Sequence, residues 1–298
     1  MTLPASRLND MRRRALEALD ASRGSVRPYA RHEDDFGEQN ASFFRHIDRR
    51  DGPSPLWGRF YRAGQISFED ALERVILPAS EITPALAGRL GGKLTAALPA
   101  VCFPTDEGRL CARVEALRDM GVRELWTENI YGVALGKRLG LSVRGGFGLN
   151  VSNREAARFY ADEGLLSLTA SFELPMAAVR ALAGDIELGI AAYGRLPLMR
   201  YRSCPIRANI GCAACGGRGE LTDRKGVSFP VECGERRYST LLNSVPLDIA
   251  GRDDPGDFRL LWFTRESRGE AAEMIGRFLR DEKASAPHTG GLYYRKVL

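Results

Sequence analysis

The sequence predicts an α/β fold, a closed (β/α)8 TIM-like barrel with a Cys-rich insertion between the seventh and eighth strands. From about Leu56, short apolar runs rich in β-branched residues alternate with helical stretches, which is the pattern of βα units around a parallel sheet. Eight such runs are present, enough to close a barrel. No Gly-rich dinucleotide fingerprint follows the first run, which disfavours an open doubly wound sheet.

The elements follow from these periodicities. Strands are expected at Leu56–Tyr61, Arg74–Leu77, Leu94–Cys102, Glu124–Thr127, Leu141–Arg144, Leu166–Ser171, Leu188–Tyr193 and Arg259–Thr264. Helices are expected at Asp106–Met120, Val133–Leu139, Asn153–Glu163, Met176–Leu182 and Ser267–Asp281.

The chain divides into five regions. Residues 1–22 form an amphipathic N-terminal helix with Leu8, Met11, Leu16 and Leu19 on one stripe. Residues 23–54, rich in charged residues, Gly and Pro, are expected to be a linker, and its His32 and His46 are interpreted as surface histidines. Residues 55–282 form the barrel, with 200–250 as an inserted metal-binding subdomain that carries four cysteines, and 283–298 form a C-terminal tail.

Composition is typical of a soluble globular chain, with 44% hydrophobic and 27% charged residues among 298. No apolar run is long enough for a membrane span or a signal peptide, and six cysteines in such a chain do not indicate a disulfide framework. We therefore expect a cytoplasmic protein. Between Arg200 and Tyr238, eight Arg and Lys stand against four Asp and Glu, a basic excess that either attracts a polyanion or is a solvated loop face.

Four cysteines lie within thirty residues: Cys204, Cys212, Cys215 and Cys233. A soft metal centre explains such clustering, because four thiolates are the usual ligands of a structural zinc or an iron–sulfur cluster. The spacing C-x7-C-x2-C-x17-C has only one two-residue knuckle, whereas zinc ribbons usually have two. Iron–sulfur is therefore favoured and zinc remains the alternative. Cys102 and Cys111 are interpreted as core residues.

Polar residues follow several predicted strands, where barrel enzymes place their chemistry. They are Glu128, Asn129, Asn150, Asn153, Ser171, Glu173, Tyr193, Arg195, Thr264 and Glu266. Facing one pocket, they could bind a small carboxylated ligand or move protons. Glu173 is the leading general acid/base candidate, with Asn150, Tyr193 and Arg195 as further catalytic candidates. Each of three residues also has an alternative role. Glu173 could be a carboxylate at a helix N-terminus, and Asn153 could cap a helix. Arg195 could pair with Glu173 or with an incoming anion.

Residues 220–231 predict a hairpin that turns at Lys225–Gly226. Arg224 and Lys225 are either turn residues or a clamp for an anionic substrate. Hydrolytic motifs are poor, because the chain has only three histidines, of which His288 alone lies outside the predicted linker, and no HExxH.

Several runs resemble the peptidase U32 family, and specifically the C-terminal barrel of its long, multi-domain members. They are Tyr193–Met199, Leu221–Gly226, Phe229–Val231, Leu242–Leu247 and His288–Tyr294, together with the four cysteines and an opening segment similar to the one that joins that barrel to preceding domains. The resemblance covers nearly the whole chain and is strongest between Tyr193 and Leu247.

The family was named for collagenase-like proteolysis. Its members also include iron–sulfur proteins for oxygen-independent hydroxylation of transfer RNA, of ribosomal RNA and of a ubiquinone precursor, with prephenate implicated as hydroxyl donor. The resemblance therefore implies a 4Fe-4S cluster on Cys204, Cys212, Cys215 and Cys233, an RNA substrate, and an upstream domain of the same family as partner.

The sequence departs from the family signature at three positions. The first signature cysteine falls on Pro197, the acidic residue on Gly189 and the histidine on Tyr193, whereas Gly194, Leu196, Cys204 and Ile206 fit. This barrel is then the degenerate partner of a two-barrel protein. Three functions follow: an iron–sulfur module for RNA-base hydroxylation, a peptidase, or a non-catalytic barrel that supports an upstream catalytic domain.

Overall fold

The computed structural model describes residues 4–24, 53–182, 184, 186–234, 236–252 and 256–294. The chain separates into two units, Met1–Phe44 and Arg45–Leu298. Most of the predicted linker, with His32 and His46, lies outside the described residues. Among these residues no helix is long and apolar enough to cross a membrane.

In the first unit, residues 4–24 are described and form a helix, α1 (Ala5–Arg23), close to the predicted bounds. None of its residues is buried, and the apolar stripe of Leu8, Met11, Leu16 and Leu19 is exposed. An ion pair between Asp10 and Arg13 spans 2.7 Å along its surface, which suits neighbours three positions apart on a helix.

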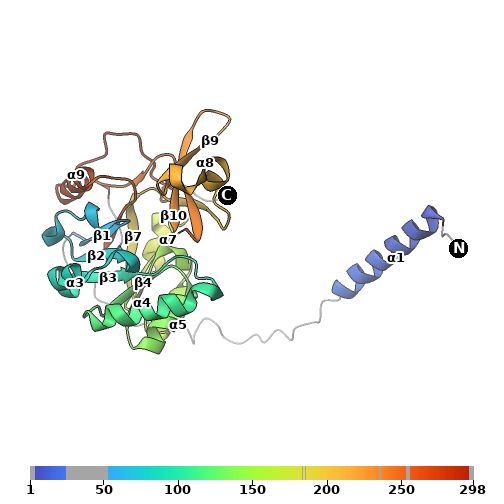
Figure 1. The fold of residues 1–298 in the computed structure, drawn as a ribbon, viewed down its shortest axis with the longest axis horizontal. Coiled ribbons are helices and arrows are strands. Elements are labelled where there is room, and N and C mark those ends of the chain that lie inside the picture. Colours follow the sequence, from blue (N-terminus) through green and yellow to red (C-terminus); the bar gives the residue numbers. More distant parts are fainter. Residues whose placement is uncertain are drawn as a thin grey trace. The chain divides into compact units, whose positions relative to one another are not determined.

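The second unit is built on a closed barrel of eight parallel strands, as predicted (Figure 1). The strands are β1 (Leu56–Phe60), β2 (Arg74–Pro78), β3 (Leu94–Ala97), β4 (Glu124–Thr127), β5 (Ser142–Gly145), β6 (Ser167–Thr169), β7 (Glu187–Gly194) and β13 (Arg259–Phe263). They pair in that order, and β13 returns to β1 to close the ring. The third strand ends at Ala97, so Cys102 lies in the following loop and not at a strand end.

Helices surround the barrel. They are α3 (Pro84–Leu90), α4 (Glu107–Asp119), α5 (Ile130–Leu139), α6 (Arg154–Asp162), α7 (Met176–Leu182) and α9 (Arg268–Leu279). Short 3-10 turns lie at Ala63–Gln65, Glu69–Ala71, Ala79–Glu81, Gly91–Lys93, Pro104–Asp106 and Phe147–Leu149. The sequence did not predict α3, although Thr83 caps its first turn.

Buried charges close the amino-terminal end of the barrel. Arg144, only 6% exposed, lies 2.7 Å from Glu124 and 3.0 Å from Glu187. Beyond them the interior is packed by large aromatic residues, with Trp57 stacked on Phe258 at 3.5 Å between ring centroids. This end of a barrel serves stability, which leaves the opposite end for chemistry.

The insertion between β7 and β13 forms a separate antiparallel sheet. Its position, between the seventh and eighth barrel strands, is the one that the sequence predicts. Its strands are β8 (Pro197–Tyr201), β9 (Arg218–Thr222), β10 (Ser228–Gly234) and β11 (Tyr238–Leu242), in the order β8-β11-β10-β9. Helix α8 (Pro205–Cys215) connects β8 to β9, and a short strand, β12 (Leu247–Asp248), pairs with β7. Figure 1 shows β9, β10 and α8 together at one end of the barrel.

Only the β9–β10 hairpin of this insertion was predicted from the sequence. Helix α8 was not, because Gly211 interrupts its periodicity with a φ of 78°. Strand β8 was not predicted because three of its five residues are exposed and it lacks a clear alternation.

Candidate functional site

The four clustered cysteines come from two elements of the insertion. Cys204 precedes α8, Cys212 and Cys215 lie in its last turns, and Cys233 lies on β10. All four line one cavity of about 500 Å³. Helix α8 can pack closely on β9 because Gly219 has no side chain, and a Cβ there would lie 2.6 Å from Ile206. The fold therefore brings Cys233 on β10 to the same cavity as the three cysteines at the two ends of α8.

Backbone amides point at two of the sulfurs. Gly217 donates to Cys215 Sγ and Arg236 donates to Cys233 Sγ, each at 3.3 Å. Gly217, with a φ of 83°, allows the chain to turn back toward Cys215. Burial raises the pKa of Cys233, and so does the charge of the other three thiols, while the amide of Arg236 lowers it. Repulsion among neighbouring thiolates is what a bound cation relieves.

No group of three or more His, Cys, Asp or Glu that could hold a metal ion is formed in the part of the chain that the structure describes. The thiols thus share a cavity without forming a closed ligand shell. Their donor type fits an iron–sulfur cluster, because such clusters are held by four cysteine thiolates and tuned by hydrogen bonds to sulfur.

A second cavity, of about 550 Å³, lies over the mouth of the barrel. Its floor comes from the carboxyl ends of β1 to β4 and β13, and its opposite wall includes Cys212, Cys215 and Cys233. We call it the mouth cavity and the first one the cysteine cavity. Because three cysteines line both, a group bound by them would lie beside the mouth cavity, at the end where barrel enzymes act.

Glu128 joins the barrel to the insertion inside the mouth cavity. Its side chain is 2% exposed and pairs with Arg59 on β1 and, at 2.8 Å, with Arg200 on β8. The Arg59 guanidinium also lies 4.6 Å above the Trp262 ring. Because one buried carboxylate contacts both guanidinium groups, Glu128 fixes the position of both arginines.

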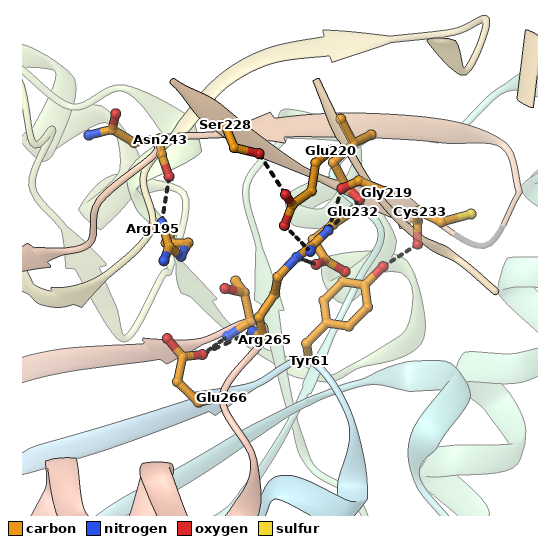
Figure 2. Close-up of polar contacts among 12 residues, drawn as sticks. Tyr61, Arg195, Gly219, Glu220, Ser228, Glu232, Cys233, Asn243, Arg265 and Glu266 are labelled. Atoms are coloured by element: carbon orange, nitrogen blue, oxygen red, sulfur yellow. Dashed lines mark hydrogen bonds and ion pairs between the residues drawn. The ribbon is translucent and has the colours of Figure 1, made fainter. Parts of the chain in front are cut away.

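A second connection runs from Arg265, just after β13. Its guanidinium contacts Glu232 at 2.7 Å and Glu220 at 3.2 Å, and donates to the carbonyl of Gly219 at 2.5 Å (Figure 2). In the same figure the Tyr61 hydroxyl donates to the Cys233 carbonyl. Burial raises the pKa of Tyr61 and of Glu232. These contacts hold the cysteine-bearing strand β10 against the barrel.

The predicted strand-end residues do not face one pocket, contrary to expectation. Glu128 and Thr264 line the mouth cavity. Tyr193, Arg195 and Glu266 line a separate cavity of about 370 Å³ with His288. The reason is that β7 continues to Gly194 and pairs there with β12, which carries its end outward.

In that separate cavity the side chains of Tyr193 and Arg195 both have hydrogen-bond partners. The Tyr193 hydroxyl donates to Glu266 at 3.0 Å. Arg195 donates to the carbonyls of Asn243 and Ser244, not to Glu173 as one alternative proposed. Tyr193 and Arg195 therefore lie apart from the cysteines, and their catalytic role stays a prediction.

The remaining candidates lie outside these cavities. Asn129 caps α5 and Asn153 caps α6, which confirms the capping interpretation of Asn153. Ser171 is buried, while Asn150 and Glu173 are exposed, and none of the three lines a cavity described above. The proposed acid/base role of Glu173 remains untested, and nothing in its surroundings supports it.

Arg224 and Lys225 occupy the tip of the β9–β10 hairpin. Asp223 Oδ1 accepts from the amides of Lys225 at 2.8 Å and Val227 at 2.9 Å, and Gly226 has a φ of 80°. Both side chains are exposed. This geometry is that of a turn, and it does not place them at either cavity.

Sequence reasoning missed the charged residues at and beside the mouth cavity. Arg59, Arg200 and Glu232 line it, and Arg265 contacts Glu232, but none of the four was singled out. Two of them could have been recognised from the sequence. Arg59 is a charged residue within an apolar strand, and Glu232 precedes Cys233, a predicted metal ligand. Arg200 carried none, because its partner Glu128 is 72 residues away.

Solved structures to which this chain is similar include the following two. The U32 peptidase Mk0906 is 16% identical over 74% of this chain and 97% of its own, with a TM-score of 0.43. The glycoside hydrolase domain of a PelA variant from Pseudomonas aeruginosa is 15% identical over 48% of this chain and 69% of its own, with a TM-score of 0.24. No protein-family model matches the chain, and no curated protein does.

Proposed function

We propose that this chain is a cytoplasmic iron–sulfur protein of the U32 type that supports oxygen-independent hydroxylation of an RNA base, in transfer or ribosomal RNA. One observation carries the proposal: Cys212, Cys215 and Cys233 line both the cysteine cavity and the mouth cavity. A redox group on these sulfurs would adjoin a cavity of about 550 Å³, a size that accommodates a small organic substrate.

Cys204, Cys212, Cys215 and Cys233 are the residues that would hold a 4Fe-4S cluster. When bound, such a cluster supplies electron transfer at the rim of the barrel. The cysteine cavity of about 500 Å³ supports a group larger than a single ion, and the amides of Gly217 and Arg236 supply the hydrogen bonds to sulfur that such clusters use.

Basic residues surround the cysteines. Arg202, Arg207, Arg236 and Arg237 all line the cysteine cavity. Their positive charge would balance an anionic cluster and attract the phosphates of a nucleic acid. One of them is committed elsewhere, because Arg237 pairs with Asp106 at 2.7 Å.

Hydroxylation turns a C–H bond of the base into C–OH, a two-electron oxidation. In the proteins that this chain resembles, prephenate is implicated as the hydroxyl donor, so we propose that a hydroxylated organic co-substrate supplies both the hydroxyl group and the oxidising equivalents. In this reaction the protein would hold the base in the mouth cavity, beside the cysteines. The ion pairs of Glu128 and Arg265 would keep the insertion in position on the barrel.

The test uses anaerobically purified full-length protein and RNA. We expect binding that weakens as salt rises, because phosphate contacts release counterions. Replacing Arg207 with Ala should reduce that salt dependence, whereas Arg123→Ala, at the opposite end of the barrel, should not. RNA from cells that lack the gene should then lack one hydroxylated base, restored by the wild-type chain and not by Cys215→Ser. Salt-independent binding, or an unchanged set of modified bases, would contradict the proposal.

A further inference from the structure

Two buried polar atoms in the mouth cavity have no hydrogen-bond partner among the residues that the structure describes. They are Glu232 Oε2 and Thr264 Oγ1. Glu232 is 3% exposed and Thr264 is fully buried, and both line the mouth cavity. Buried polar groups in proteins are nearly always hydrogen-bonded, and an unmade bond is costly. Two such atoms at one cavity indicate a ligand that completes them.

The surroundings of Glu232 define what this ligand must offer. Arg265 already occupies Oε1 at 2.7 Å, which leaves Oε2 as an acceptor. The Glu232 oxygen therefore requires a ligand that donates a hydrogen bond. Arg59 and Arg200, two of the four arginines that line the cavity, are both paired with Glu128. Thr264 can donate or accept, because a hydroxyl does both.

Beside these polar groups the cavity also has apolar and aromatic walls. Its walls include Phe60, Leu98, Tyr238, Leu242 and Trp262. The ligand must therefore bond to Glu232 and Thr264 and also pack against apolar walls. A flat heterocycle that carries an N–H beside a carbonyl does both, because it has apolar faces and a polar edge. Nucleobases have this chemistry.

We infer that Glu232 and Thr264 are the specificity-determining residues of the mouth cavity and bind the polar edge of a nucleobase. Glu232 Oε2 accepts a hydrogen bond from an N–H of the base, and the Thr264 hydroxyl bonds to the adjacent carbonyl oxygen. This inference rests on the proposed function and adds which atoms select the base.

The experiment measures the dissociation constants of uridine and N3-methyluridine with anaerobically purified full-length protein. The two ligands differ in one N–H, so their affinity ratio reports the Glu232 contact. Wild-type protein should prefer uridine by about tenfold or more, the effect of a hydrogen bond to a charged group. In Glu232→Gln the ratio should fall toward one, since an amide nitrogen replaces an acceptor.

Two matched controls separate this role from a structural one. Glu220 also contacts Arg265 but is 54% exposed and does not line the mouth cavity, so Glu220→Gln should keep the preference. Thr264→Val should weaken uridine binding, whereas Thr169→Val should not, although Thr169 Oγ1 is equally buried and has no hydrogen-bond partner within the described residues.

The outcomes are distinct. A preference for uridine over N3-methyluridine that is lost in Glu232→Gln and kept in Glu220→Gln supports the inference. A ratio unchanged in Glu232→Gln overturns the inference and leaves the proposed function standing. If wild-type protein that carries its cluster binds neither nucleoside, both the inference and the proposed RNA substrate fail.

Discussion

Arg200, on the first strand of the inserted sheet, lies 2.8 Å from Glu128, which follows the fourth barrel strand. Glu128 also pairs with Arg59, so one buried carboxylate connects the barrel wall to the cysteine-bearing insertion. The contact fixes where the cysteines lie relative to the barrel mouth.

Removing the Glu128 carboxylate should destabilise the protein strongly. Glu128→Ala leaves Arg59 buried at 13% exposure without its partner, a loss of about 3–5 kcal/mol in the free energy of unfolding. Lys137→Ala breaks an ion pair with Glu163 whose lysine is 52% exposed, and should cost at most about 1 kcal/mol. Chemical denaturation measures both, and equal losses in the two variants would contradict the role of Glu128.

The Tyr61 hydroxyl should matter for the cysteine site beyond its effect on stability. Tyr61→Phe removes the hydrogen bond to the Cys233 carbonyl and should cost about 1 kcal/mol of stability. Tyr131→Phe removes a comparable bond to the carbonyl of Pro99, which follows β3 and is not part of the inserted sheet, and serves as the control. We expect faster loss of bound metal to a chelator in Tyr61→Phe only. The same rate in both variants would show that Tyr61 does not position β10.

The six cysteines should fall into two groups. Serine at Cys204, Cys212, Cys215 or Cys233 should abolish metal binding, because each would remove one thiolate ligand. Serine at Cys102 or Cys111, which pack against the barrel core, should leave metal content unchanged. Metal per chain, measured on each purified variant, checks this. Loss of metal in Cys102→Ser would place a ligand outside the cysteine cavity.

The capping box of α9 gives a prediction about pH. Ser267 accepts from the Glu270 amide at 3.2 Å, and Glu270 accepts from the Ser267 amide at 2.7 Å. The Ser267 amide, and after it the Ser267 hydroxyl, lower the pKa of Glu270 in the folded state. Its contribution is therefore present above the ordinary glutamate pKa and is lost as pH falls through the lowered value.

Glu270→Ala should thus cost about 0.5 kcal/mol at neutral pH, the size expected of an exposed hydrogen bond, and less at strongly acidic pH. Denaturation curves across the acidic range measure this difference. A cost that stays constant down to the lowest pH would mean that the charge of the Glu270 carboxylate contributes nothing.

The sequence predicts the barrel well because its strands and longer helices are periodic. Strand β4 and helix α7 have the predicted bounds, and the insertion lies between the predicted strands. The clustering of four cysteines is visible in the sequence, but α8 is not, since Gly211 breaks the periodicity on which a helix prediction depends.

The candidate site was predicted less well, for a physical reason. Strand ends are readable in a sequence, but which cavity each one faces depends on pairing between distant segments. The β7–β12 pairing carries Tyr193 away from Glu128. Likewise Arg265 meets Glu232 only because β10 folds back over the end of β13.

The most direct test of this account is metal analysis of the full chain purified without air, together with its absorbance spectrum. We expect about four iron atoms and four labile sulfides per chain with the broad visible absorbance of a thiolate-bound cluster, all lost in Cys215→Ser. One zinc per chain without sulfide, or a wild-type protein that binds no metal at all, would contradict it.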